Sequence, residues 1–581
     1  IGTGVVMSVP SHAPYDWAAI VDIKNNPGII IKFGLEPSLI KDIKPISLIS
    51  VEGFGEHPAI EICQRMGIKN QMDPKLIEAT QEIYKKEFHT GILKENTEKY
   101  VGKKVYEAKK ILVEDFISFG IADKMYDLPE AVVCRCTTRC LVKILKDQWF
   151  LRYSNEGWKT LTKEALKKAK VFPEVATKMF EDTIDWLEDK ACVRKTGFGT
   201  KLPWSPEWKV ETLSDSTIYQ VFYTIIPLIR KYKIKLEDLT PNFFDYVFYE
   251  KGERPNIKEI DEIKEEFRYW LPVDFRNSAK ELIPNHFTFY LFHYVVLFPK
   301  DKWPRELGVN GMINIEGQKM SKSKGIFITL RQALEDSSAD ILRFALLNTN
   351  EGIEDVDFRK QGVEEARKHL ERLYDLANYI LQLENDGKIG VCERWLLSRF
   401  NKNIDIATKA FEITANRTAL QYGYFEIFND LKWYLRKVEK PNGKILKDLL
   451  SAWVRILAPV VPHICEEIWE KLGNKNFVSL AEWPKPVEEF IDDKILRLEE
   501  VFKTTVEDIN QIIKITGVKN KLFIYVATDE EFTYFIESLN FFKREFKFQE
   551  AKIFRSNDPR RYDPKNKAKK ARPGKLGLYL E

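Results

Sequence analysis

The amino-acid sequence predicts a multidomain protein that combines α/β regions with an all-α region and a small α+β domain at the end. Its 581 residues are enough for several domains. Hydrophobic residues make up 44% of the chain, including 37 Phe, 23 Tyr and 13 Trp, so large cores can form and global disorder is excluded. After about Leu342 the spacing of apolar residues changes from a mixture of short patterns to a helical period.

The first part of the chain is predicted to mix strands and helices. Residues 3–10 read as a buried strand, and residues 29–33 read as a second strand set between turn signals. Helical patterns cover residues 15–21, 72–88 and 102–119. In the second of these helices Asp73 is predicted as the N-cap and Pro74 as the first helical residue.

Farther along, short strands and helices alternate over residues 131–213, which is typical of an α/β domain. Residues 330–347 read as a helix. A helical bundle is predicted from five further segments, at residues 361–383, 394–411, 418–438, 445–457 and 462–472. Beyond residue 492, one helical stretch precedes a strand at residues 521–527 and a final apolar segment at residues 576–580.

Charge over the whole chain gives no argument for nucleic acid, since 91 Lys and Arg nearly balance 87 Asp and Glu. From residue 541 to 581, however, thirteen Lys and Arg stand against five Asp and Glu. Such a basic end is either a solvated, mobile tail or a contact for a phosphate backbone. Seven cysteines, no signal-like start and no apolar run long enough for a bilayer predict a soluble, cytoplasmic protein without a membrane partner.

The strongest chemical signal is the loop Gly317-Gln318-Lys319-Met320-Ser321-Lys322-Ser323-Lys324-Gly325. Most clusters of Lys, Ser and Gly are solvated turns. Such a loop can also bend close to a polyphosphate, offer N–H groups and hydroxyls, and place ammonium groups on developing negative charge. Its order Lys-Met-Ser-Lys-Ser matches letter for letter the signature of class I aminoacyl-tRNA synthetases.

That resemblance implies nucleotidyl transfer, in which a carboxylate attacks the α-phosphate of ATP and pyrophosphate leaves. Cations that tighten on the phosphates in the transition state would accelerate this step. Lys319 and Lys322 are the catalytic candidates. Met320, Ser321 and Ser323 complete the expected ATP-binding loop.

The resemblance extends along nearly the whole chain to leucyl-tRNA synthetases of the archaeal/eukaryotic type. Residues 2–16 resemble the later half of that family's editing pocket. Asp147-Gln148-Trp149-Phe150, Ser214-Asp215-Ser216-Thr217-Ile218-Tyr219 and Leu282-Ile283-Pro284-Asn285-His286 resemble its catalytic domain. Arg394-Trp395-Leu396-Leu397-Ser398-Arg399 and Ala458-Pro459-Val460-Val461-Pro462-His463 resemble its anticodon-binding bundle.

Three further site residues follow from the resemblance. Asp16 matches the family's editing aspartate, which binds the α-ammonium of a mischarged amino acid; a lone Asp at this place is otherwise a helix cap. Glu281 and His286 are expected to lie against the adenosine of ATP, or else to form only a polar turn. The family more often has Gly and Asp where this chain has Ala279 and Glu281.

Cys134, Cys136 and Cys140 form a tight thiol cluster, with Cys192 as a possible fourth ligand. Their spacing is not the common one for zinc, so a structural zinc and free buried cysteines both remain open. No metal ligand is assigned.

The resemblance also defines what the sequence lacks. No His-x-Gly-His element and no threonine-rich editing segment occur, so the chain is expected to be the C-terminal portion of the enzyme, as a fragment or as one subunit of a split synthetase. Four domains are expected: a partial, β-rich editing domain (1–125), the second half of a Rossmann-like catalytic domain (126–345), the anticodon-binding bundle (346–490) and a small tRNA-contacting domain (491–581).

The expected function is therefore that of a leucine–tRNA ligase that uses ATP and Mg²⁺, with hydrolytic editing in the intact enzyme. Its expected partners are leucine, ATP, leucine tRNA and an N-terminal half that carries the missing element. Without that half, the chain is expected to be inactive. The alternatives are a non-catalytic tRNA-binding protein derived from a synthetase and another class I synthetase.

Overall fold

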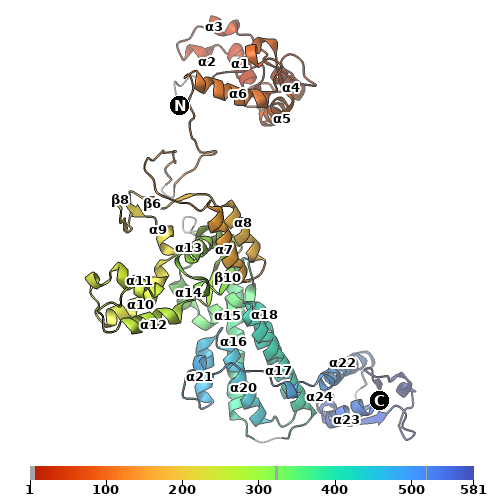
Figure 1. The fold of residues 1–581 in the computed structure, drawn as a ribbon. Helices are drawn as coiled ribbons and strands as arrows, with labels where there is room; N and C mark the ends of the chain where they lie inside the picture. The colour runs from red at the N-terminus through yellow and green to blue at the C-terminus, as the bar shows by residue number, and fades with distance from the viewer. Residues whose placement is uncertain (1–6, 135–136, 321–324, 386–387, 519) are drawn as a thin grey trace. The chain divides into compact units, whose positions relative to one another are not determined.

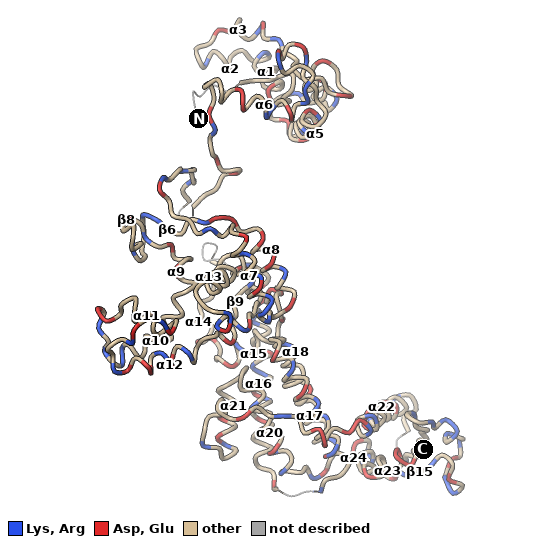
Figure 2. The backbone as a smooth tube through the Cα atoms, viewed as in Figure 1, with Lys and Arg blue, Asp and Glu red and all other residues tan. Residues whose placement is uncertain are grey.

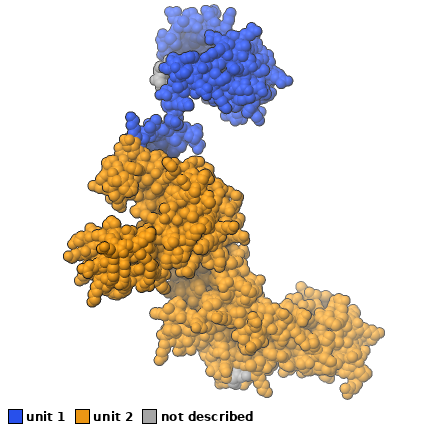
Figure 3. Space-filling view, in the orientation of Figure 1, with its two compact units in different colours: residues 1–146 blue, residues 147–581 orange. Residues whose placement is uncertain are grey.

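A computed structural model describes residues 7–134, 137–320, 325–385, 388–518 and 520–581. The chain divides into two compact units, residues 1–146 and 147–581, and each is described by itself (Figures 1 and 3). None of the helices in these ranges is long and apolar enough to cross a membrane.

The first unit is built mainly from helices that pack through small apolar clusters. The helices are α1 (Pro14–Asn25), α2 (Gly28–Ile31), α3 (Ser38–Lys41), α4 (Pro58–Met66), α5 (Lys75–Thr90) and α6 (Val105–Ser118). Ala18 of α1, Cys63 of α4 and Leu76 of α5 form one buried cluster. The strands β1 (Ile49–Ser50) and β2 (Ile92–Leu93) make the antiparallel sheet of this unit.

The prediction of a β-rich fold for this unit is wrong for its described residues. Residues 29–33 were predicted as a strand, but α2 occupies Gly28–Ile31, and only Ile30 of that helix is buried. A run of β-branched residues forms a strand only beside a partner strand, and here the turns around it leave room for a single helical turn. Residues 7–9 are not in a strand, and residues 3–6 lie outside the described residues. The three predicted helices are confirmed, although α5 begins after Pro74.

The second unit opens with an α/β region. Its helices are α7 (Glu156–Lys168), α8 (Ala176–Trp186), α9 (Thr212–Ser216), α10 (Tyr219–Lys231), α11 (Pro241–Tyr249), α12 (Ile260–Trp270) and α13 (Thr288–Leu297). A parallel sheet has the order β4 (Lys170–Phe172), β10 (Glu306–Asn310), β9 (Phe275–Ala279). Small sheets pair β3 (Phe150–Leu151) with β5 (Lys190–Ala191), and β6 (Val193–Arg194) and β7 (Lys201–Leu202) with β8 (Ser205–Val210).

Helix α13 lies in the centre of this region and is buried on nearly all sides. Its His293 joins two distant segments, since one ring nitrogen is 2.9 Å from the hydroxyl of Tyr153 and the other is 2.5 Å from that of Thr217. One apolar core contains Leu151, Leu213 and Ile283, which lie in or beside the segments 147–150, 214–219 and 282–286 that the sequence alone singles out.

The all-α region agrees with the sequence. Its helices are α16 (Lys360–Gln382), α17 (Val391–Glu412), α18 (Asn416–Leu420), α19 (Ile427–Lys437), α20 (Gly443–Leu457) and α21 (Pro462–Lys471), and a π-helical stretch (Gln421–Glu426) joins α18 to α19. The five predicted segments are all helical. Leu370, Leu396 and Leu446 illustrate the buried faces that meet in the bundle core.

A small α+β domain ends the chain. It contains α22 (Asp493–Thr516), α23 (Asp529–Glu537) and α24 (Leu539–Phe546), with a sheet in the order β15 (Glu550–Arg555), β14 (Lys521–Val526), β16 (Gly577–Leu580). The predicted strand is confirmed as β14, and the final apolar segment forms β16. The basic residues from 541 onward belong to this α+β domain, and many of them are exposed to solvent.

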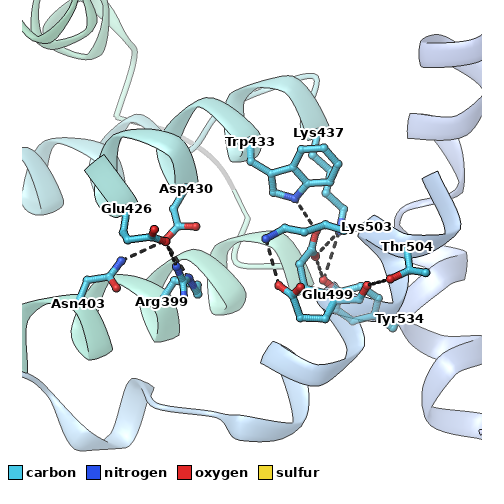
Figure 4. Close-up of polar contacts among 11 residues, drawn as sticks. Arg399, Asn403, Glu426, Asp430, Trp433, Lys437, Glu499, Lys503, Thr504 and Tyr534 are labelled. Atoms are coloured by element: carbon cyan, nitrogen blue, oxygen red, sulfur yellow. Dashed lines mark hydrogen bonds and ion pairs between the residues drawn. The ribbon is translucent and has the colours of Figure 1, made fainter. Parts of the chain in front are cut away.

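A buried ion pair ties this last domain to the bundle, and a second pair lies within the bundle (Figure 4). Lys437 of α19 donates to Glu499 of α22 at 2.5 Å, and neither side chain is more than 1% exposed. Glu499 also accepts from Trp433 Nε1 at 2.6 Å and from the hydroxyl of Tyr534. A second pair joins Arg399 of α17 to Asp430 of α19. Because unpaired buried charges are costly, these pairs fix how the helices meet.

Candidate functional site

The candidate ATP site is built at the carboxyl ends of the parallel strands β9 and β10. Parallel α/β sheets bind ligands at this edge because the loops that follow the strands meet there. After β9 the chain enters a tight turn (Lys280–Leu282) and a π-helical turn (Ile283–Phe287). After β10 it enters the hairpin of β11 (Ile313–Ile315) and β12 (Gln318–Lys319). The loop of residues 317–325, here called the lysine loop, begins at the tip of this hairpin.

Two aspartates from a neighbouring strand anchor that hairpin. Strand β13 (Val356–Phe358) pairs with β11 in parallel. Asp355 accepts from the N–H of Met312 at 2.9 Å, and Asp357 accepts from the N–H of Gly317 at 2.7 Å. Gly317 has φ +77°, a conformation that glycine adopts without strain. The start of the lysine loop is thus held on a rigid support.

Lys319 is the last residue of β12, and its side chain is exposed. Lys280 pairs with Asp355 at 2.7 Å, and this contact, with the charge of Lys319 nearby, holds the pKa of the Asp355 carboxyl below its usual range. Met320 follows, half-buried. Ser321, Lys322 and Ser323 lie outside the described residues. Positive charge therefore converges on the hairpin from the loops after both strands.

The predicted residues Glu281 and His286 lie on the turn that follows β9. Glu281 is exposed, and its main-chain carbonyl accepts from the side-chain amide of Asn285 at 2.7 Å. His286 is half-buried, and its Nε2 lies 2.6 Å from Nη2 of Arg276 on β9. Burial, and then the charge of Arg276, lower the pKa of His286 to about 4.

Sequence reasoning missed Arg276, Lys280 and Asp355. A signal existed for Arg276, because a long cation inside a short strand of a buried sheet needs a partner. The contact between Lys280 and Asp355 joins residues 75 positions apart, and no local pattern predicts it.

In the first unit, Asp16 lies in the first turn of α1, where negative charge stabilises a helix. Its Oδ2 accepts from the N–H of Val9 at 2.6 Å. Nearby, His12 Nδ1 lies 2.7 Å from Glu87, and His12 Nε2 accepts from the N–H of Leu48 at 2.9 Å. The N-cap of α1 is Ala13 and no side chain caps this helix, so the alternative that Asp16 is a helix cap is wrong. Asp16 instead ties the start of the helix to the segment before it.

The cysteines give no support for zinc. Cys134 is exposed and Cys140 is half-buried, so the alternative of free, buried cysteines is wrong for these two. Cys136 lies outside the described residues. Cys192 donates to the carbonyl of Trp149. Within the part of the chain that is described, no group of three His, Cys, Asp or Glu could hold a metal ion.

The last domain is rich in Lys and Arg, which are the blue segments of the backbone near the C-terminus in Figure 2, and several of them form an exposed basic surface. Its exposed cations are Arg560, Lys565, Lys569, Lys570, Arg572 and Lys575. They lie in the short helix Lys567–Lys570, whose Ala568 is buried, and on the segments around it. A folded basic surface of this kind suits a phosphate backbone.

Comparison with known families agrees with this geometry. Residues 255–380 match a family described as "tRNA synthetases class I (M)", and residues 393–528 match "Anticodon-binding domain of tRNA ligase". Two segments of the chain therefore match domains of class I aminoacyl-tRNA synthetases.

The similar curated proteins are more specific. The leucine–tRNA ligase of Pyrococcus abyssi is 42% identical over 96% of this chain and 60% of that protein, and that of Methanosarcina barkeri is 44% identical over 90% and 55%. The chain is thus a homologue of leucine–tRNA ligases that spans about three fifths of their length. A methionyl-tRNA synthetase of Mycobacterium tuberculosis bound by methionyl-adenylate aligns over 56% of this chain and 63% of its own, with a TM-score of 0.44 and 17% identity, which is too distant to carry an argument.

Proposed function

We propose that this chain is the part of a leucine–tRNA ligase that supplies the lysine loop, the anticodon-binding bundle and the basic C-terminal domain. The 42% identity over 96% of the chain carries this proposal. The hairpin that holds Lys319 at the carboxyl edge of β9 and β10 supports it, because this edge is where an α/β sheet binds a nucleotide.

In the proposed reaction the carboxylate of leucine attacks the α-phosphate of ATP, and the bond to pyrophosphate breaks. The resulting leucyl-adenylate then transfers leucine to its tRNA. Lys319 and Lys322 stabilise the charge that develops on the phosphates, and Met320, Ser321 and Ser323 shape the loop. Glu281 and His286 contact the nucleotide.

Mg²⁺ is proposed to arrive with the phosphates of ATP. The described residues lack a group of three metal-binding side chains, so the protein fits a metal bound chiefly by its nucleotide. The rest of the catalytic sheet is proposed to come from the part of the relatives' length that this chain does not match. In the first unit, Asp16 is proposed to bind the α-ammonium of a mischarged amino acid during editing.

Leucine-dependent exchange between ATP and pyrophosphate tests the main proposal. We expect exchange when the chain is combined with the unmatched segment of a similar ligase, and none with either part alone. Lys319→Met should lower the exchange rate on the order of 10²-fold. Lys178→Met, which removes an exposed lysine paired with Asp182 on α8, should leave the rate unchanged.

A non-catalytic tRNA-binding protein is the second candidate, and the basic surface of the last domain favours it. If no exchange appears with the complementary segment while leucine tRNA still binds, this candidate replaces the first. For either candidate function, replacing Lys569 and Lys570 by glutamine should weaken tRNA binding. It should also reduce the slope of the logarithm of the binding constant against the logarithm of salt concentration by about two.

A further inference from the structure

We propose that Arg276 is a positioning residue that holds His286 as the neutral tautomer with its proton on Nδ1. His286 then offers its ligand one hydrogen-bond donor and no acceptor. The identity of the ligand rests on the proposed function, but the state of the imidazole does not.

The contact between the two side chains fixes the tautomer. Nη2 of Arg276 lies 2.6 Å from Nε2 of His286. A guanidinium is always protonated and has only donors, so Nε2 must be the acceptor and carries no proton. An imidazolium would have no lone pair there and would place two cations in contact. The ring is therefore neutral, and its one proton lies on Nδ1.

Arg276 is itself held in place by aromatic rings. Its Cζ lies 4.3 Å from the ring centre of Tyr290 and 5.7 Å from that of Phe287. Both rings belong to the turn and helix that follow β9, so the strand and the turn are fixed to each other through the guanidinium. A planar cation stacked on aromatic faces loses little freedom when it donates.

The same cluster contains two unsatisfied polar groups. Nη1 of Arg276 and the hydroxyl of Tyr290 are buried and have no hydrogen-bond partner among the described residues. Buried groups of this kind are normally paired. Nη1 of Arg276 and the Nδ1–H of His286 can only donate, whereas the hydroxyl of Tyr290 can donate or accept. Such a cluster suits an acceptor oxygen, as on a carboxylate, a phosphate or a ribose.

This arrangement limits what His286 can do. Among the described residues, Arg276 is the charged group that contacts it, and burial followed by this charge opposes its protonation. His293 on α13, the other imidazole nearby, has a lowered pKa itself, in part because of His286. With a pKa lowered to about 4, His286 is neutral at physiological pH. It therefore acts as a donor to the nucleotide and not as a general acid or base.

Long-range proton–nitrogen spectra of the full chain with ¹⁵N-labelled histidine test the proposal without any activity measurement. For His286 we expect a protonated Nδ1, an unprotonated Nε2 and no titration above about pH 5. Arg276→Met should mix the two tautomers and raise the pKa by about 1 unit, because a nearby cation is lost. Arg305→Met, which removes an exposed arginine paired with Asp274 at 2.7 Å, should change neither.

The signals of His293 report whether α13 still packs correctly in these variants. If Arg276→Met disturbs them, Arg276→Lys decides, since it keeps a cationic donor and should leave His286 neutral at pH 7. A proton on Nε2 in the natural chain, or an unchanged tautomer after loss of Arg276, would overturn the proposal. Neither outcome depends on whether exchange of pyrophosphate is observed.

Discussion

At the scale of single residues, His293 shows how the core of the α/β region depends on an uncharged imidazole. Both ring nitrogens are engaged, by Tyr153 and Thr217, and the side chain is buried. Burial, and then the neighbouring His286, lower its pKa to about 4. The unfolded chain binds a proton at this histidine below about pH 6.5, whereas the folded chain does so only near pH 4.

Folding stability should therefore fall as the pH drops from about 6.5 to 4, by up to ~3 kcal/mol for His293. His293→Gln should lower stability at pH 7 but weaken the dependence on pH within this window. Urea titrations at several pH values measure both effects. His89→Gln, which changes an exposed histidine of the first unit, is the control and should follow the natural chain.

At the scale of residues, the sequence predicted those site residues that belong to a short recognisable motif. Lys319 and His286 were found because they lie in recognisable segments, and both lie at the carboxyl edge of the sheet. Arg276 and Asp355 act through partners distant in the chain, and such partners are visible only after folding.

At the scale of elements, helices were predicted well and boundaries less well. Residues 330–347 were predicted as one helix, but the chain forms α14 (Leu330–Asp336) and α15 (Ala339–Thr349). The hydroxyl of Ser338 accepts from the N–H of Ile341 and starts a new helix. The break lets α15 bury Asp340, which accepts from the N–H of Ile464 at the start of α21 at 2.7 Å.

The hairpin of β11 and β12 yields a prediction at this scale. Gly317→Ala should destabilise the hairpin by about 1 kcal/mol, since φ +77° is strained for a residue with a Cβ atom. Hydrogen exchange of residues 313–319 should become faster. Gly362→Ala in α16, where a Cβ meets no atom within 4 Å, should instead be neutral or stabilising. Equal exchange in both variants would contradict a strained turn.

At the scale of the second unit, the bundle and the last domain behave as one body. A continuous apolar cluster runs from α15 through the bundle to β14 and β15. The sequence predicted the bundle and the last domain but not that they share one core and a buried ion pair. Lys437 and Glu499 are 62 residues apart, and each resembles an ordinary surface charge in the sequence.

Lys437→Met should destabilise this body by about 3–5 kcal/mol, because it leaves the carboxylate of Glu499 buried without its cation. The double variant with Glu499→Leu should recover part of that loss. Chemical denaturation measures both. Lys409→Met, which breaks the exposed pair with Asp405, should change stability by less than about 1 kcal/mol. A small effect of Lys437→Met would mean that water reaches the pair.

The parallel sheet β4–β10–β9 has a consequence for handling the protein. Among the described residues, β4 and β9 each pair with a strand on one side only, so both are edge strands. Phe275 on β9 is 43% exposed. Open strand edges with apolar side chains template pairing between chains. Purified alone, this chain should thus self-associate with increasing concentration, and coexpression with the complementary segment should suppress that association.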